Sequence, residues 1–239
     1  MKTKYEIPQP IFDFIEKNII NSGIKRQKKI TYINNDFENS KAVFYLICEK
    51  LLKSELGESI KFNLTESFEA AVNILIKYAH CQFDNDIDNV KGIVLFGNTG
   101  SRKTFLMQTL NLYLSLINAK FTNCNIEQPF CCKKQLSNDV YYQFLNDKEN
   151  YFYNKIINSD VVNIDDLGSE PKEAVTFGNR LNVLEKILEM RYNKDKITHI
   201  TTNFDKEKIK TFYGERVLSR MLQKSHFIEL IDYDFRTKK

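Results

Sequence analysis

The chain has 239 residues, of which 42% are hydrophobic and 28% are charged, and its formal net charge is +4. This length allows one α/β domain with a small additional module, and the hydrophobic content is sufficient for a packed core. The sequence lacks an apolar run long enough to span a membrane and an N-terminal signal core, so we expect a cytoplasmic protein without a membrane partner. Five cysteines without a CxxC pair argue against a zinc site or a disulfide framework.

The first part of the chain is expected to be helical. Apolar residues recur at helical spacing over residues 11–19 and again over residues 42–56. We therefore predict a small helical, partner-binding module over residues 1–58. A larger α/β domain is expected to follow over residues 59–239.

Strand and helix patterns alternate through the larger domain. Strands are expected over residues 92–96, 129–132, 161–164 and 197–202, and helices over residues 66–80, 104–117, 139–145, 151–157 and 181–192. Asn63, with Glu66 three residues later, is expected to cap the first of these helices. The alternation predicts a parallel central sheet that is covered by helices on both faces, which is a three-layer α/β fold.

The segment GNTGSRKT, residues 97–104, follows one predicted strand and opens one predicted helix. Small residues in this position allow backbone N–H groups to turn toward phosphate oxygens, and the helix N-terminus adds a favourable dipole. Lys103 is expected to reach the β- and γ-phosphates of ATP, and Thr104 to place its hydroxyl on Mg²⁺. The predicted nucleotide-binding residues are Gly97, Asn98, Thr99, Gly100, Ser101, Arg102, Lys103, Thr104 and Phe105.

One position departs from the usual phosphate-loop pattern. Glycine normally precedes the lysine, whereas this chain has Arg102. The N–H of Arg102 can donate to a phosphate if the backbone is helical there. Its side chain can crowd the loop, fold outward, or reach a phosphate as an additional cation. The sequence therefore predicts nucleotide binding and leaves open whether ATP is hydrolysed.

Two carboxylates follow the third predicted strand, in the segment VVNIDDLG of residues 161–168. Asp165 is expected to hold Mg²⁺, and Asp166 to orient and deprotonate an attacking water. The next strand ends at Asn203, which can hydrogen-bond that water or the γ-phosphate, although a lone asparagine there is more typical of a turn. Arg216 and Arg220 are four residues apart and share one helix face; spacing alone favours surface salt bridges for them.

Taken in order, GNTGSRKT, VVNIDDLGSE, HITTNF and YGERVLSRM resemble the motifs of AAA+ replicative helicase loaders of the DnaC-like kind and of the related IstB-like ATPases. The resemblance covers roughly residues 62–235 and implies a P-loop AAA+ fold without a C-terminal lid. It also implies an arginine-finger role for Arg220, a nucleotide-facing role for Arg216 and a sensor role for Asn203.

The resemblance further implies ATP-dependent self-assembly, single-stranded DNA binding and a replicative hexameric helicase as the partner. Candidate DNA contacts are Lys133, Lys134, Tyr141 and Tyr142, since bases stack on tyrosine, although tyrosines in such a pattern are more often packed core aromatics. One alternative function is an IstB-like transposition helper that acts on duplex DNA with a transposase. Another is a nucleotide-binding protein with little hydrolysis because of Arg102. A monomeric P-loop kinase would need an acceptor site and a lid that the sequence does not indicate.

Overall fold

The computed structural model describes residues 25–27, 37–56, 64–80, 91–117, 119–123, 126–130, 134–147, 149–176 and 179–231. The helix expected over residues 11–19 lies outside these ranges. The described part contains no helix that is long and apolar enough to cross a membrane.

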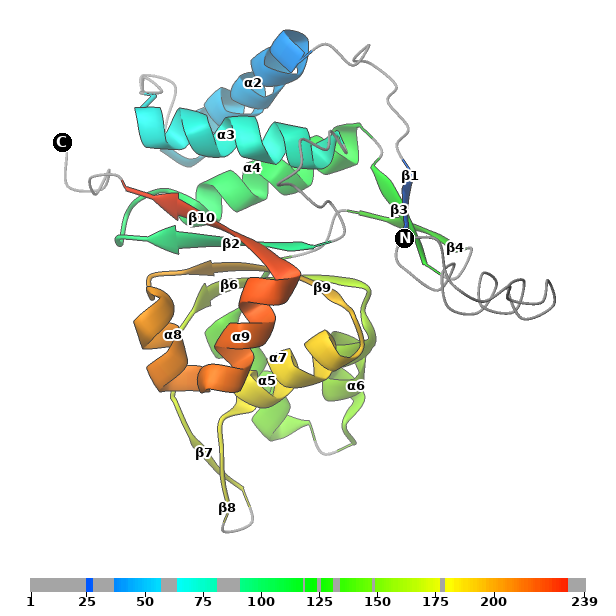
Figure 1. Ribbon diagram of the computed structural model, residues 1–239, viewed down its shortest axis with the longest axis vertical. Helices are drawn as coiled ribbons and strands as arrows, with labels where there is room; N and C mark the ends of the chain where they lie inside the picture. The colour runs from blue at the N-terminus through cyan, green and yellow to red at the C-terminus, as the bar shows by residue number, and fades with distance from the viewer. Residues whose placement is uncertain are drawn as a thin grey trace, which may run out of the picture.

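A five-stranded parallel sheet forms the centre of the molecule (Figure 1). Its spatial order is β10-β2-β9-β6-β5, so the first strand of the sheet lies between two strands from the end of the chain. The strands are β2 (Gly92–Gly97), β5 (Lys134–Leu136), β6 (Val161–Leu167), β9 (Ile197–Thr202) and β10 (Ser225–Leu230). Because all pairs are parallel, the carboxyl ends of the strands meet at one edge, where α/β proteins bind their ligands.

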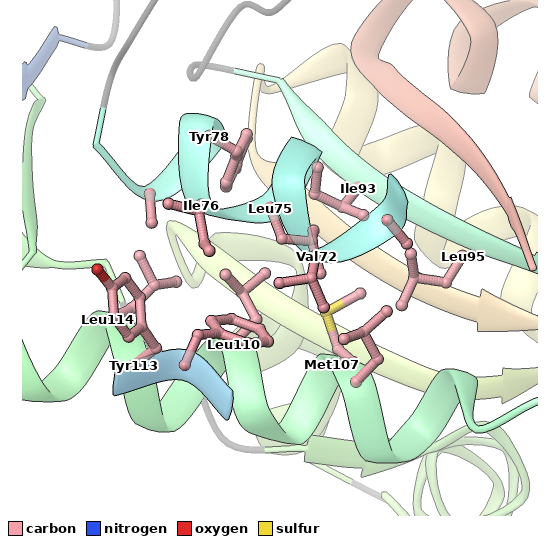
Figure 2. Close-up of a cluster of buried hydrophobic side chains, with 14 of the residues drawn as sticks. Val72, Leu75, Ile76, Tyr78, Ile93, Leu95, Met107, Leu110, Tyr113 and Leu114 are labelled. Atoms are coloured by element: carbon pink, nitrogen blue, oxygen red, sulfur yellow. The ribbon is translucent and has the colours of Figure 1, made fainter. Parts of the chain in front are cut away.

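Among the described residues, three helices pack on one face of the sheet, and Figure 1 shows them on that side. They are α2 (Phe37–Leu56), α3 (Glu66–Ala79) and α4 (Lys103–Leu116). Their apolar residues form one core with the apolar side of β2, and Figure 2 shows Leu75 of α3 and Leu110 of α4 in one apolar cluster with Ile93 and Leu95. The burial of this face fixes α4, and with it the loop that precedes the helix.

In the described ranges, five helices pack on the opposite face, where Figure 1 shows them. They are α5 (Ser137–Asn146), α6 (Tyr151–Asn158), α7 (Val183–Asn193), α8 (Lys206–Tyr213) and α9 (Glu215–Lys224). Polar caps begin two of them: Asn182 accepts from the N–H of Glu185 at 3.0 Å, and Asp205 accepts from the N–H of Lys208 at 2.8 Å. The predicted three-layer α/β fold is therefore confirmed.

Two small antiparallel sheets accompany the central one. One contains β1 (Lys25–Gln27), β3 (Lys120–Asn123) and β4 (Ile126–Pro129), and the other is the hairpin of β7 (Ala174–Thr176) and β8 (Asn179–Leu181). In Figure 1 this hairpin projects away from the body of the molecule. The strand β1 is a departure from the all-helical N-terminal region that the sequence predicts.

Two local predictions are wrong. The strand expected over residues 129–132 overlaps β4 only at Pro129, where β4 ends, and residues 131 and 132 lie outside the described residues. The strand of the central sheet in this region is β5, which starts at Lys134 and pairs with β6. The cap of α3 is Thr65, whose hydroxyl accepts from the N–H of Phe68 at 3.2 Å. An N-cap directly precedes the first helical residue, so Asn63 stands too early in the chain, and it lies outside the described residues.

The predicted boundary near residue 58 falls between α2 and α3. Phe44, Cys48 and Leu52 of α2 are buried in the same core as α3 and α4. The division into a partner-binding module and an ATPase domain therefore stays a prediction, as does the absence of a C-terminal lid.

Candidate nucleotide-binding site

The loop between β2 and α4 wraps around the ammonium group of Lys103. This group donates to the carbonyl oxygens of Gly97 at 2.9 Å and Asn98 at 2.7 Å, and to the hydroxyl of Ser101 at 3.2 Å. Gly97 has a φ of +143°, and a Cβ there would lie 2.2 Å from the carbonyl oxygen of Leu230. The loop thus requires glycine at its start, and the three hydrogen bonds that Lys103 donates hold the loop closed around its ammonium group.

Arg102 adopts a left-handed backbone conformation, with a φ of +63° and a ψ of +22°. Side chains other than glycine are strained there by about 1–2 kcal/mol, which explains why glycine is usual at this position. Arg102 is the residue before α4, and its backbone is left-handed. It therefore lacks the helical backbone with which its N–H was expected to donate to a phosphate. Burial raises the pKa of the Cys48 thiol on α2 to about 12, although its hydrogen bond to Thr109 acts against this rise.

The other predicted loop residues differ in their exposure. Asn98 and Thr99 are exposed at the tip of the loop, whereas Ser101 is fully buried. The side chain of Phe105 belongs to the core, so only its backbone N–H can face a ligand. The predicted nucleotide contacts are accordingly polar main-chain groups, Lys103 and the exposed tip.

Asp165 lies at the end of β6 and is 3% exposed. Its Oδ1 atom accepts from the hydroxyl of Thr104 at 2.8 Å and from that of Thr201 at 2.6 Å. Its Oδ2 atom lies 3.8 Å from the ammonium group of Lys134 on β5. The structure thus joins the two predicted metal-binding residues, Thr104 and Asp165, directly to one another. Hydroxyl and carboxylate oxygens are ligands that suit Mg²⁺.

Asp166 and Asn203 also meet at this edge of the sheet. The amide of Asn203 donates to Oδ1 of Asp166 at 3.1 Å, and the backbone N–H of Asp166 donates to the hydroxyl of Thr201 at 2.9 Å. Asp166 has a φ of +56°, and the register of β6 and β9 shifts between Ile164 and Leu167. This irregularity turns the second carboxylate toward the asparagine at the tip of the next strand.

The two arginines lie on the exposed side of α9. Arg216 is within 3.5 Å of Glu189 on α7, and Arg220 donates to Gln223 at 2.9 Å. Both side chains are exposed. Their contacts are with surface residues of their own chain, and their role toward a nucleotide stays a prediction.

The predicted DNA contacts separate in the structure. Lys134 lies beside Asp165 and so belongs to the candidate nucleotide site. Tyr141 is buried, and its hydroxyl donates to the carbonyl oxygen of Glu173 at 3.1 Å, so its ring is a core aromatic and cannot stack on a base. Tyr142 is 55% exposed, whereas Lys133 lies outside the described residues.

Sequence reasoning missed Thr201, which holds both neighbouring aspartates. The signal is its place in the chain, since Thr201 is the second-to-last residue of β9, at the carboxyl end of a strand in a parallel sheet. It also missed Lys134 as a counter-ion, because the position of β5 was wrongly predicted.

No protein-family model matches this sequence, and no curated protein matches it. Among solved structures, the chain is similar to the DnaC helicase loader, with 21% identity and a TM-score of 0.53 over 71% of this chain and 93% of the other. DnaI gives 18% identity and a TM-score of 0.49 over 74% and 87%. Domain III of the Thermotoga maritima replication initiation protein DnaA gives 18% and 0.48 over 72% and 66%.

The likeness to the DnaC helicase loader is a likeness of fold. The predicted AAA+ fold is confirmed, and the predicted resemblance to DnaC-like loaders is confirmed at the level of that fold.

Proposed function

We propose that this chain binds ATP and Mg²⁺ at the loop of residues 97–104. The observation that supports the proposal is the convergence of Lys103, Thr104, Asp165 and Asp166 at the carboxyl edge of one parallel sheet. A cation at the start of a helix, a hydroxyl and two carboxylates are the groups that phosphoryl chemistry requires.

Each residue has a distinct part in this proposal. Lys103 would exchange its loop oxygens for phosphate oxygens, and Thr104 and Asp165 would hold Mg²⁺. ATP would supply the phosphoanhydride bond, and Mg²⁺ would neutralise charge on the phosphates. Asp166 accepts a proton from water, and Asn203 fixes the orientation of that carboxylate through its hydrogen bond.

The exposed arginines fit a site that is completed by a second copy of the chain. Arg220, with Arg216 as a second cation, would stabilise charge on the γ-phosphate held by a neighbouring subunit. ATP-dependent oligomers should therefore form on single-stranded DNA. Analytical ultracentrifugation should detect them in the wild type and with Arg180→Ala, a change of an exposed arginine on β8, but not with Arg220→Ala. A wild type that stays monomeric with ATP and DNA contradicts this part.

Binding of nucleotide is tested by titration with a fluorescent ATP analogue. Lys103→Ala should weaken binding by about tenfold to a hundredfold, because hydrogen bonds to a charged group contribute about 1.5–3 kcal/mol. Lys194→Ala is a matched control, since Lys194 is exposed and precedes the amino end of β9. Equal affinities of the wild type and Lys103→Ala would refute the site.

We further propose that the ATP cycle loads a replicative hexameric helicase onto single-stranded DNA. The support for this step is the likeness of the fold to the DnaC helicase loader together with the order of the four motifs. The N-terminal module would hold the helicase. Affinity purification with ATP should recover that helicase with the wild type and much less of it with Lys103→Ala. Recovery of a transposase would instead favour the IstB-like alternative.

The left-handed backbone of Arg102 favours a second candidate function, in which the chain binds nucleotide and hydrolyses it slowly. Strain in the loop and an arginine side chain beside it would then limit turnover. Weak turnover in the wild type that increases with Arg102→Gly would support this alternative.

A further inference from the structure

Glu170 is a buried carboxylate that the proposed nucleotide chemistry does not use. It is 3% exposed, its Oε1 atom accepts from the hydroxyl of Tyr213, and its Oε2 atom accepts from the N–H of Gly168 at 2.9 Å. Burial raises the pKa of the Tyr213 hydroxyl, and the charge of Glu170 raises it further. The phenol therefore keeps its proton and remains the donor to a carboxylate that two directed donors hold in place.

One end of this contact belongs to the segment that follows the two carboxylates. The hydroxyl of Ser137 donates to the carbonyl oxygen of Asp166 at 2.8 Å. Gly168 has a φ of +100°, and a Cβ there would lie 2.5 Å from the ring of Phe204. The segment is thus confined between α5 and the end of β9, and a displacement of Asp166 reaches Glu170 within four residues.

The other end belongs to the helix that carries the exposed arginines. Tyr213 is the last residue of α8 and is fully buried. Gly214 joins it directly to α9, which begins at the next residue and contains Arg216 and Arg220. Figure 1 shows α8 leading into α9 beneath the sheet. Glu170 therefore connects the carboxylate segment to the start of the arginine helix across 43 residues of sequence.

We infer that the Glu170–Tyr213 hydrogen bond is a positioning contact, which makes the orientation of α9 depend on the nucleotide site. The inference rests on the proposed function, because nucleotide would act on the segment through Asp165 and Asp166. Without the bond, α9 remains folded, since Val217 and Met221 anchor it in the core, but it no longer follows the segment. Binding at the loop would then leave the arginines unchanged.

Hydrogen exchange of the full chain, with and without Mg²⁺ and a non-hydrolysable ATP analogue, tests this coupling. In the wild type, nucleotide should slow exchange both in residues 97–104 and in α9. In Tyr213→Phe, which removes only the hydroxyl, the slowing in the loop should persist and the slowing in α9 should be lost. Tyr153→Phe is the matched control, because Tyr153 is half-buried on α6 and packs against Phe144. It should behave as the wild type.

The outcomes separate the two claims. A wild type that shows no slowing in the loop refutes the nucleotide site itself. Slowing in the loop without slowing in α9, or equal slowing of α9 in the wild type and Tyr213→Phe, overturns the positioning contact. If Tyr213→Phe does not fold, Glu170→Met carries the same test, because it removes both accepting oxygens and keeps a side chain of similar length. An unchanged response of α9 in a folded Glu170→Met would again overturn the inference.

Discussion

Replacement of Arg102 by glycine tests whether the phosphate loop holds backbone strain. Arg102 has a φ of +63° immediately before α4. Release of a left-handed arginine contributes about 1–2 kcal/mol, and the greater freedom of glycine in the unfolded chain removes about 0.4–1 kcal/mol of this gain. We therefore expect Arg102→Gly to stabilise the protein by about 0.5–1 kcal/mol. For a domain of this size, that corresponds to a rise of about 1–4 °C in Tm.

Thermal unfolding measured by circular dichroism checks this expectation, and Arg102→Ala is the control. Alanine removes the guanidinium but keeps the Cβ that causes the strain, so it should not raise Tm. The pair of variants separates the backbone from the side chain. A fall in Tm with glycine, or an equal rise with alanine, would refute the strain argument. ATP turnover measured on the same samples shows whether release of the strain also increases hydrolysis.

Three further predictions concern buried polar groups. Arg191 donates to the hydroxyl of Thr198 and to three carbonyl oxygens. Arg191→Met should therefore lower the free energy of unfolding, measured in urea, by about 3–5 kcal/mol. A decrease below about 1 kcal/mol would contradict this role. Thr201→Val removes a donor to Asp165 and should weaken Mg²⁺-dependent binding of the ATP analogue while leaving Mg²⁺-free binding unchanged. Burial raises the pKa of the Cys48 thiol to about 12, so its contribution to stability is complete at low pH and is lost as pH rises above about 9. Stability measured against pH should therefore fall less steeply in Cys48→Ala, and parallel curves would contradict this.

The order of strands and helices along the chain and the position of the loop at residues 97–104 could be predicted, because both follow from local sequence patterns. A buried strand such as residues 92–96, followed by small residues and then a long apolar helix, has few other structures available to it. The carboxylates at the end of β6 and Asn203 at the end of β9 follow from the same reasoning, since parallel strands bring their carboxyl ends together.

The missed features depend on contacts that no local pattern records. The strand β5 is a short edge strand with alternating exposure, so its sequence KQL carries no apolar run. The left-handed conformation of Arg102 depends on how the loop closes around Lys103. The pairing of Glu170 with Tyr213 depends on the path of the chain between them.

The packing of α2 has a thermodynamic consequence. The ring of Phe44 on α2 packs at a tilt against that of Tyr113 on α4, with 5.4 Å between ring centroids, and the thiol of Cys48 lies 3.6 Å from the hydroxyl of Thr109. Lys103 is the first residue of that same α4. If the chain binds nucleotide as proposed, a partner that binds α2 and shifts it would therefore alter the free energy of that binding. By reciprocity, nucleotide would change the affinity for that partner by the same factor.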